Sequence, residues 1–158
     1  MRSPLVALSL TVASTALAES ATVDYPEGYR HWSHVKSLIL EPGHPLYDAF
    51  GGLHHIYAND KAIEGYRAGG FPDGAVIVFD LLGVQKGDNA IAEGPRKILG
   101  VMQRDAQKFA ETGGWGFEGF AEGDPDQRAV GDQAKGACYG CHAEQAADTA
   151  LVFSVWRD

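Results

Sequence analysis

Apolar and polar positions alternate in short runs along this chain, and turns containing glycine or proline separate the runs. The apolar runs are rich in Val, Ile and aromatic residues and are too short for long amphipathic helices. This pattern indicates strands of an antiparallel sheet. It predicts strands at residues 34–40, 53–58, 75–82, 97–104, 115–120 and 152–156, the last of which would close the sheet.

Helices are predicted to be few and short. Asn59 is a favourable N-cap and Gly69 a favourable C-terminal stop, so a helix is expected between them. A polar loop at 86–89 is expected to join the third and fourth strands of a hairpin. The alanine-rich stretch 132–145 predicts a C-terminal helix. We therefore expect an α+β fold, with an antiparallel sheet of about five strands and a few short helices.

The first 18 residues have the pattern of a secretory signal. Arg2 provides a positive start, Leu5–Thr15 is apolar but shorter than a membrane span, and Ala16-Leu17-Ala18 fits a small-x-small cleavage site. A membrane anchor is the alternative. Cleavage would leave residues 19–158 as a single domain with no further candidate span.

Acidic residues outnumber basic ones by 21 to 13, and the formal net charge is −8. Loss of Arg2 with the leader would make the mature chain one unit more negative. This balance argues against nucleic acid or an anionic membrane surface as a partner. It suits an exported protein in the periplasm.

The most informative motif is Cys138-Tyr139-Gly140-Cys141-His142, which contains the only two cysteines of the sequence. Cys-x-x-Cys-His is the signature of covalent c-type haem attachment, in which two thiols bond one porphyrin and the imidazole binds its iron. A redox dithiol would not require His142, and a zinc site would need a fourth ligand close by. We therefore predict one haem c, bound through Cys138, Cys141 and His142.

The position of this motif distinguishes between kinds of cytochrome. Only 16 residues follow His142, and none is methionine. Met102, the one methionine outside the leader, lies within a predicted strand and suits a core better than an axial ligand. A chain with 20 glycines and β-type runs also does not suit a four-helix bundle. A small electron-carrier cytochrome and a helical cytochrome c′ are both disfavoured.

The sequence resembles the cytochrome P-460 and cytochrome c′-beta family over nearly the whole mature chain. The resemblance rests on the late Cys-Tyr-Gly-Cys-His and on the stretches His54-His55-Ile56-Tyr57-Ala58-Asn59, Phe71-Pro72-Asp73-Gly74, Gly100-Val101-Met102, Trp115-Gly116-Phe117-Glu118 and Val152-Phe153-Ser154. It implies a β-rich homodimer whose single haem is open on the side opposite the histidine. Cytochromes P-460 oxidise hydroxylamine with a haem cross-linked to lysine, whereas cytochromes c′-beta lack the link and bind nitric oxide under a hydrophobic cap.

The strand after the Pro-x-Gly turn favours the c′-beta branch. The resemblance implies that the cross-linking lysine would lie there, but residues 75–81 contain no lysine, and Phe79 stands at or near the expected place. The nearest lysines, Lys86 and Lys97, lie in the next loop and strand. Phe79 is therefore a candidate cap over the iron or, alternatively, an ordinary core residue. Hydroxylamine oxidation and simple electron transfer are the alternative functions, and a redox partner protein is possible.

His54 is the second distal candidate. His54 and His55 are adjacent on a predicted strand, so their side chains should point to opposite faces. The resemblance implies that His54 occupies a distal polar position, where it would hydrogen-bond a bound ligand, close the iron as a sixth ligand, or serve only in packing. Phe50 and Phe120 are weaker candidates for the cap.

Overall fold

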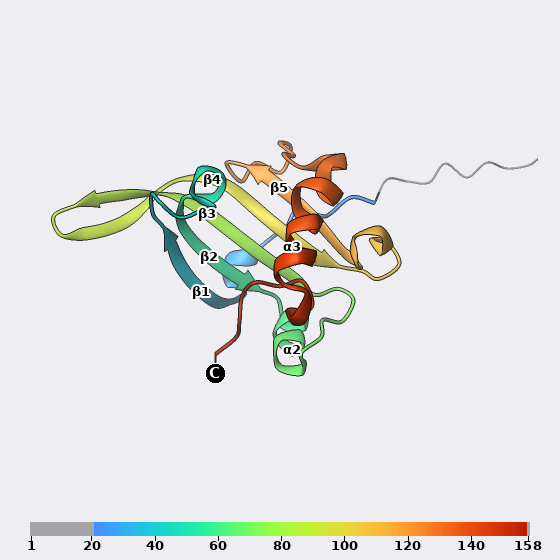
Figure 1. Cartoon of the computed structure of the whole chain (residues 1–158). Coiled ribbons are helices and arrows are strands. Elements are labelled where there is room, and N and C mark those ends of the chain that lie inside the picture. Colours follow the sequence, from blue (N-terminus) through green and yellow to red (C-terminus); the bar gives the residue numbers. More distant parts are fainter. Residues whose placement is uncertain (1–20, 158) are drawn as a thin grey trace, which may run out of the picture.

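Five antiparallel strands in chain order form the centre of the protein (Figure 1). The computed structural model describes residues 21–157, so the signal peptide expected at residues 1–18 lies outside the described residues. The sheet order is β1-β2-β3-β4-β5, and each strand pairs with the next one in the sequence. The strands are β1 (Ser33–Leu40), β2 (Gly52–Ala58), β3 (Val76–Gly87), β4 (Ala90–Arg104) and β5 (Trp115–Ala121).

The helices are short, and the expected α+β class is confirmed. The α-helices are α1 (Tyr47–Phe50), α2 (Asp60–Ala68) and α3 (Gly140–Gln145). A π-helical turn (Lys135–Tyr139) precedes α3, and single 3₁₀ turns lie at Tyr29–His31, Ala110–Thr112, Gly131–Gln133 and Ala147–Thr149. No helix between residues 21 and 157 is long and apolar enough to cross a membrane.

The predicted capping of α2 is confirmed. The Asn59 side-chain oxygen accepts a hydrogen bond from the Ala62 amide at 2.9 Å and another from the Val76 amide at 3.0 Å. Gly69 ends the helix in the left-handed conformation, with φ 77°. One asparagine therefore starts the helix and also fixes it to the first residue of β3.

Two hydrophobic cores lie on opposite faces of the sheet. The first lies on the face covered by α2 and the C-terminal segment that carries α3, and it contains Ile56, Ala58, Ile77, Trp115 and Phe117. The second is covered by the N-terminal segment and contains Val23, Tyr29, Val78, Leu99, Val101, Phe109 and Phe120. Alternation along each strand assigns one set of side chains to each core. We call the first the helix-covered face.

A buried ionic network fixes the second face. Asp80 has 0% exposed surface and accepts hydrogen bonds from Arg96 Nε at 2.6 Å and from the Tyr29 hydroxyl at 2.7 Å. Arg96 Nη2 also reaches the second Asp80 oxygen at 3.2 Å. Burial and the bond to Asp80 raise the pKa of Tyr29 well above its ordinary value, so the phenol stays a donor. The network joins the N-terminal segment to β3 and β4.

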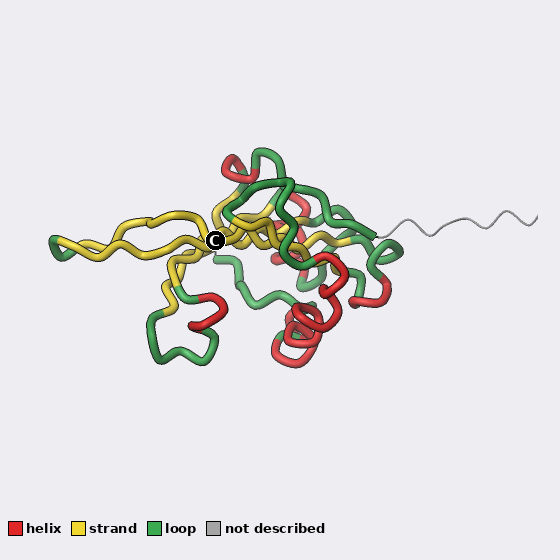
Figure 2. Tube along the Cα trace, turned by 90° about the horizontal axis from the view of Figure 1, so that it is seen from above, coloured by secondary structure: helices red, strands yellow, loops and turns green. Residues whose placement is uncertain are grey.

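The hairpin of β3 and β4 is longer than the sequence pattern predicted. A polar loop was expected at 86–89, but pairing continues to Gly87 opposite Ala90. Only Asp88 and Asn89 form the turn, with φ 51° and 58°, because these residue types tolerate the left-handed region that a two-residue hairpin requires. The end of the hairpin projects from the body as an arm (Figures 1 and 2).

The predicted strand at 152–156 is wrong, because these residues have no strand conformation. The outer side of β5 is occupied by the chain at 127–129, where the Ala129 amide donates to the Gly119 carbonyl at 2.7 Å. Val152 is only 2% exposed and belongs to the first core. Its apolar character therefore reflects side-chain packing and not backbone pairing.

Candidate functional site

The two cysteines lie on the short C-terminal helical segment that packs on the sheet. Cys138 is in the π-helical turn and Cys141 in α3, so both thiols lie on one helical segment, three residues apart. Neither forms a disulfide; Cys138 is half-buried against the first core, whereas Cys141 is exposed. Burial, with a smaller effect of the Glu118 carboxylate, raises the pKa of the Cys138 thiol. This side chain is therefore a thiol at neutral pH.

His142 is held in one orientation. Its Nδ1 lies 2.7 Å from the Leu151 carbonyl oxygen, which can only accept, so Nδ1 carries the proton and Nε2 keeps its lone pair. The ring contacts the rings of Phe117 and Phe153, with centroid distances of 4.9 and 4.7 Å. Burial lowers the pKa of His142, which favours the neutral imidazole. This is the form that binds metals.

Phe79 and His54 share the helix-covered face with Phe117. Cross-strand partners point to the same side of a sheet: His54 is opposite Leu81, and Phe79 is two residues from Leu81. On that face the His54 and Phe79 rings contact each other edge to face, with centroids 4.7 Å apart. Both distal candidates therefore lie on the sheet face that receives the motif helix.

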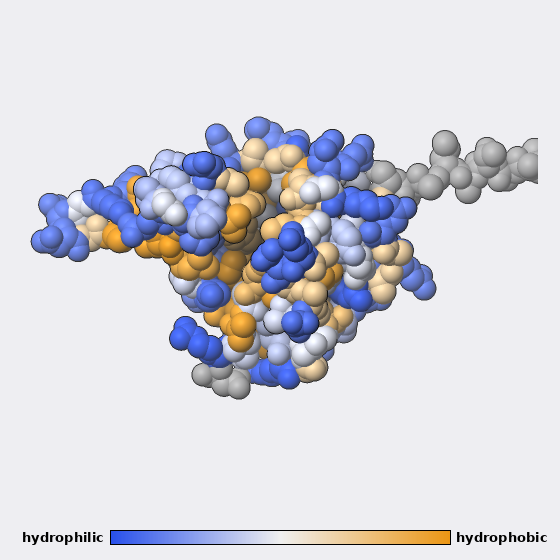
Figure 3. Space-filling model, in the orientation of Figure 1, coloured by the Kyte–Doolittle hydropathy of each residue, from blue (hydrophilic) through white to orange (hydrophobic). Residues whose placement is uncertain are grey.

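An apolar hollow opens on this side of the molecule, next to α3 (Figures 1 and 3). Gly100 and Gly119 are cross-strand partners on the same sheet face. A Cβ at Gly119 would lie 2.6 Å from Ile98 Cδ1, and one at Gly100 would lie 2.9 Å from Phe79 Cδ1. The absence of side chains at these two positions lets the Ile98 and Phe79 side chains pack directly against the backbone at the centre of the sheet.

The side chain of His54 is buried and hydrogen-bonded. It is 4% exposed, and its Nε2 donates to the Phe50 carbonyl at 2.5 Å. Burial is the largest influence on its pKa and lowers it; the charge of Lys97 acts in the same direction. His55 points to the opposite face and contacts Ser37 Oγ at 2.7 Å and Glu93 Oε1 at 2.8 Å. The predicted alternation of the two histidines is confirmed.

The two weaker candidates for the cap, Phe50 and Phe120, lie on different sides of the sheet. The Phe50 ring contacts the Phe79 ring with centroids 5.9 Å apart and so lies on the side of the hollow. Phe120 is fully buried in the second core, so its place on the other face of the sheet contradicts a role as cap. Met102 is half-buried and packs against the first core, which agrees with the interpretation as a core residue.

Sequence reasoning missed the surroundings of His142. In the sequence, Phe117 and Phe153 stand out only as members of the stretches that carry the family resemblance, and the Leu151 carbonyl has no sequence signature at all. For Phe117 the signal was available, because Trp115 and Phe117 recur with the two-residue period of a strand and so belong to one face. The role of Phe153 depends on how the chain turns after α3.

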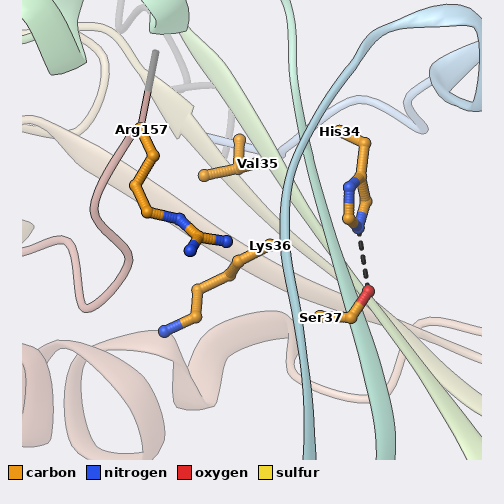
Figure 4. A pocket seen from close by; sticks show the side chains of 5 residues that line it. All are labelled: His34, Val35, Lys36, Ser37 and Arg157. Atoms are coloured by element: carbon orange, nitrogen blue, oxygen red, sulfur yellow. Dashed lines mark hydrogen bonds between the residues drawn. The ribbon is translucent and has the colours of Figure 1, made fainter.

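A separate open pocket of about 570 Å³ lies beside the edge strand β1, lined by His34, Val35, Lys36, Ser37 and Arg157 (Figure 4). Lys36 and Arg157 extend into the same space, whereas His34 bonds Ser37 at 2.9 Å on the other side of the strand. None of the motif residues lines this pocket. It therefore adds nothing to the site around His142.

The chemistry of the donors fits a haem. Two thiols in no disulfide, a neutral imidazole whose Nε2 keeps its lone pair and an apolar hollow beside α3 define a β-rich protein of the haem c class. Comparison with family models agrees. Residues 26–154 match the model of cytochrome P-460, and the chain belongs to this family. No curated protein matches the chain.

Proposed function

We propose that this chain is a periplasmic mono-haem c protein of the c′-beta type, which binds or processes nitric oxide at an iron with an open distal side. Cys138 and Cys141 would hold the haem through thioether bonds, and His142 would supply the protein's axial ligand. When bound, the haem supplies diatomic-ligand binding and one-electron chemistry. The residues 1–18 support export, and export is the condition for c-type attachment.

The observation that carries this proposal is the arrangement of one sheet face. Phe79 and His54 contact each other on the face against which His142 packs through Phe117. A phenyl ring favours small uncharged ligands over water and anions. His54 donates its Nε2 proton to Phe50, so ligation through Nε2 would require this hydrogen bond to break. That supports an iron without a second histidine ligand.

The spectrum of the reduced protein tests the proposal. We expect five-coordinate, high-spin ferrous haem that binds carbon monoxide and nitric oxide readily. The His142→Ala variant should retain covalently attached haem but lose the axial bond, with a changed spectrum. A low-spin ferrous spectrum that does not respond to carbon monoxide would refute the proposal and favour an electron-transfer cytochrome.

Hydroxylamine oxidation is the second candidate function, and the observation that favours it is the position of Lys97 near His54. Lys97 lies near enough to His54 to influence the pKa of that histidine, and its ammonium donates to the Gly51 carbonyl at 2.6 Å. Lys86 is on the projecting arm and pairs with Glu41. A haem-linked peptide that contains Lys97, found by mass spectrometry of a digest, would favour the P-460 type. A haem peptide linked through the two cysteines alone supports the c′-beta type.

The resemblance also implies a homodimer, which we include in the proposal. Light scattering on the purified holoprotein measures the assembly directly. A mass of two chains at micromolar concentration is expected, and a strictly monomeric protein would remove this part of the proposal.

A further inference from the structure

The turn after α3 contains backbone strain. Ala150 has φ 53° and ψ 39°, and Leu151 has φ 69°. Two successive residues with side chains rarely occupy the left-handed region, because Cβ approaches the carbonyl oxygen there. Strain of this kind persists only where surrounding contacts impose it, and it concentrates at functional sites.

Two hydrogen bonds impose this backbone strain, because they fix both the C=O and the N–H of the peptide unit between Ala150 and Leu151. The Trp115 indole Nε1–H donates to the Ala150 carbonyl at 3.0 Å, and the Leu151 amide donates to the Ala146 carbonyl at 2.8 Å. Trp115 is itself 2% exposed and packs edge to face on Phe71. The donor comes from β5 and is fixed in the first core.

The next carbonyl along the chain is the one that orients His142. Leu151 O accepts the Nδ1 proton of His142 at 2.7 Å. We propose that Trp115 is a positioning residue for His142, acting through the strained turn at Ala150 and Leu151. This inference rests on the proposed function, because the positioned atom, Nε2, is the one that would bind iron. A hydrogen bond at Nδ1 fixes the tautomer and increases electron donation from a ligating imidazole.

Resonance Raman spectroscopy of the reduced holoprotein measures the strength of the bond between iron and His142 as the frequency of the iron–histidine stretching band. Trp115→Phe keeps most of the ring volume and removes the N–H donor. We expect the band to move to lower frequency and the reduction potential to rise, because a looser turn weakens the bond to Leu151. Trp32→Phe is the matched control, since Trp32 packs against the second core on the other sheet face; it should leave both values unchanged.

A second variant covers the case in which Trp115→Phe does not fold. The exposed Thr149 closes the same turn, donating its hydroxyl to the Val152 carbonyl at 2.7 Å. Thr149→Val should shift the band in the same direction by a smaller amount. An unshifted band in Thr149→Val, or in a folded Trp115→Phe protein, overturns the positioning role. Absence of any iron–histidine band in the unaltered protein would instead refute the proposed function.

Discussion

Replacing Asp80 with alanine should destabilise the fold more than most single substitutions do. The carboxylate is completely buried and accepts hydrogen bonds from Arg96 and from the Tyr29 hydroxyl. Its removal leaves a guanidinium and a phenol without their acceptor. Breaking one side of a buried ion pair costs about 3–5 kcal/mol. Because the Arg96 side chain is 26% exposed and water can partly replace the acceptor, we expect the lower end.

A loss of about 3 kcal/mol corresponds to a decrease in Tm of roughly 10 °C for a domain of this size. Urea and thermal unfolding followed by circular dichroism measure both quantities. Asp80→Asn, which keeps the shape and one acceptor oxygen, should fall between alanine and the natural residue. The exposed Asp126 provides the control, and Asp126→Ala should stay within about 0.5 kcal/mol of the unaltered protein.

The location of the network makes the prediction more specific. Asp80 is on the face opposite His142, so folded Asp80→Ala protein should keep the haem spectrum of the unaltered protein while losing stability. An unfolding free energy within 1 kcal/mol of the unaltered value would refute the reasoning about the buried pair. A changed iron spectrum in the folded variant would contradict the separation of the two faces.

Three further predictions concern the helix-covered face and the strand β5. Phe79→Ala should accelerate carbon monoxide binding to ferrous iron about tenfold, equivalent to 1.4 kcal/mol, in flash photolysis if the ring caps the iron; an unchanged rate makes Phe79 a core residue. Because burial lowers the pKa of His54, the unfolded chain binds a proton that the folded site excludes, so stability should fall as the pH decreases below about 6.5. Urea unfolding from pH 8 to 5 should show this loss reduced in His54→Gln and retained in His31→Gln. Gly116→Ala would place a Cβ 2.4 Å from a buried aromatic ring and should cost about 1–3 kcal/mol in urea unfolding, whereas Gly136→Ala, with open space around it, should cost almost nothing.

Local signals in the sequence were sufficient for most of the fold. Asn59 and Gly69 predicted the limits of α2 because caps act within a few residues. The alternation of His54 and His55 followed from the geometry of any strand. The two-residue turn at Asp88 and Asn89 was also encoded locally, but the polar residues around it resemble a loop when the pairing of an exposed arm is not known.

The other differences arise from contacts between distant segments. Residues 152–156 have a strand-like composition, yet the edge of β5 is already occupied by residues 127–129. For the site, Cys138, Cys141 and His142 follow from a spacing rule. The acceptor for His142 is a backbone carbonyl in a strained turn of Ala150 and Leu151, two residue types that do not favour such a turn. Trp115 holds this turn through a hydrogen bond to the carbonyl of Ala150, which lies 35 residues later in the chain.

The order of the strands has a consequence for how the molecule assembles. Every strand pairs with its sequence neighbour, so each step of sheet formation closes only a short loop and carries a small entropic cost. The segment that carries Cys138 and Cys141 makes no strand pairing and packs on a surface that the completed sheet provides. The meander can therefore fold while both thiols are still outside it. Under the proposed thioether attachment, these cysteines would react on a tethered peptide beside a folded scaffold, and docking of that peptide would be the final step of folding.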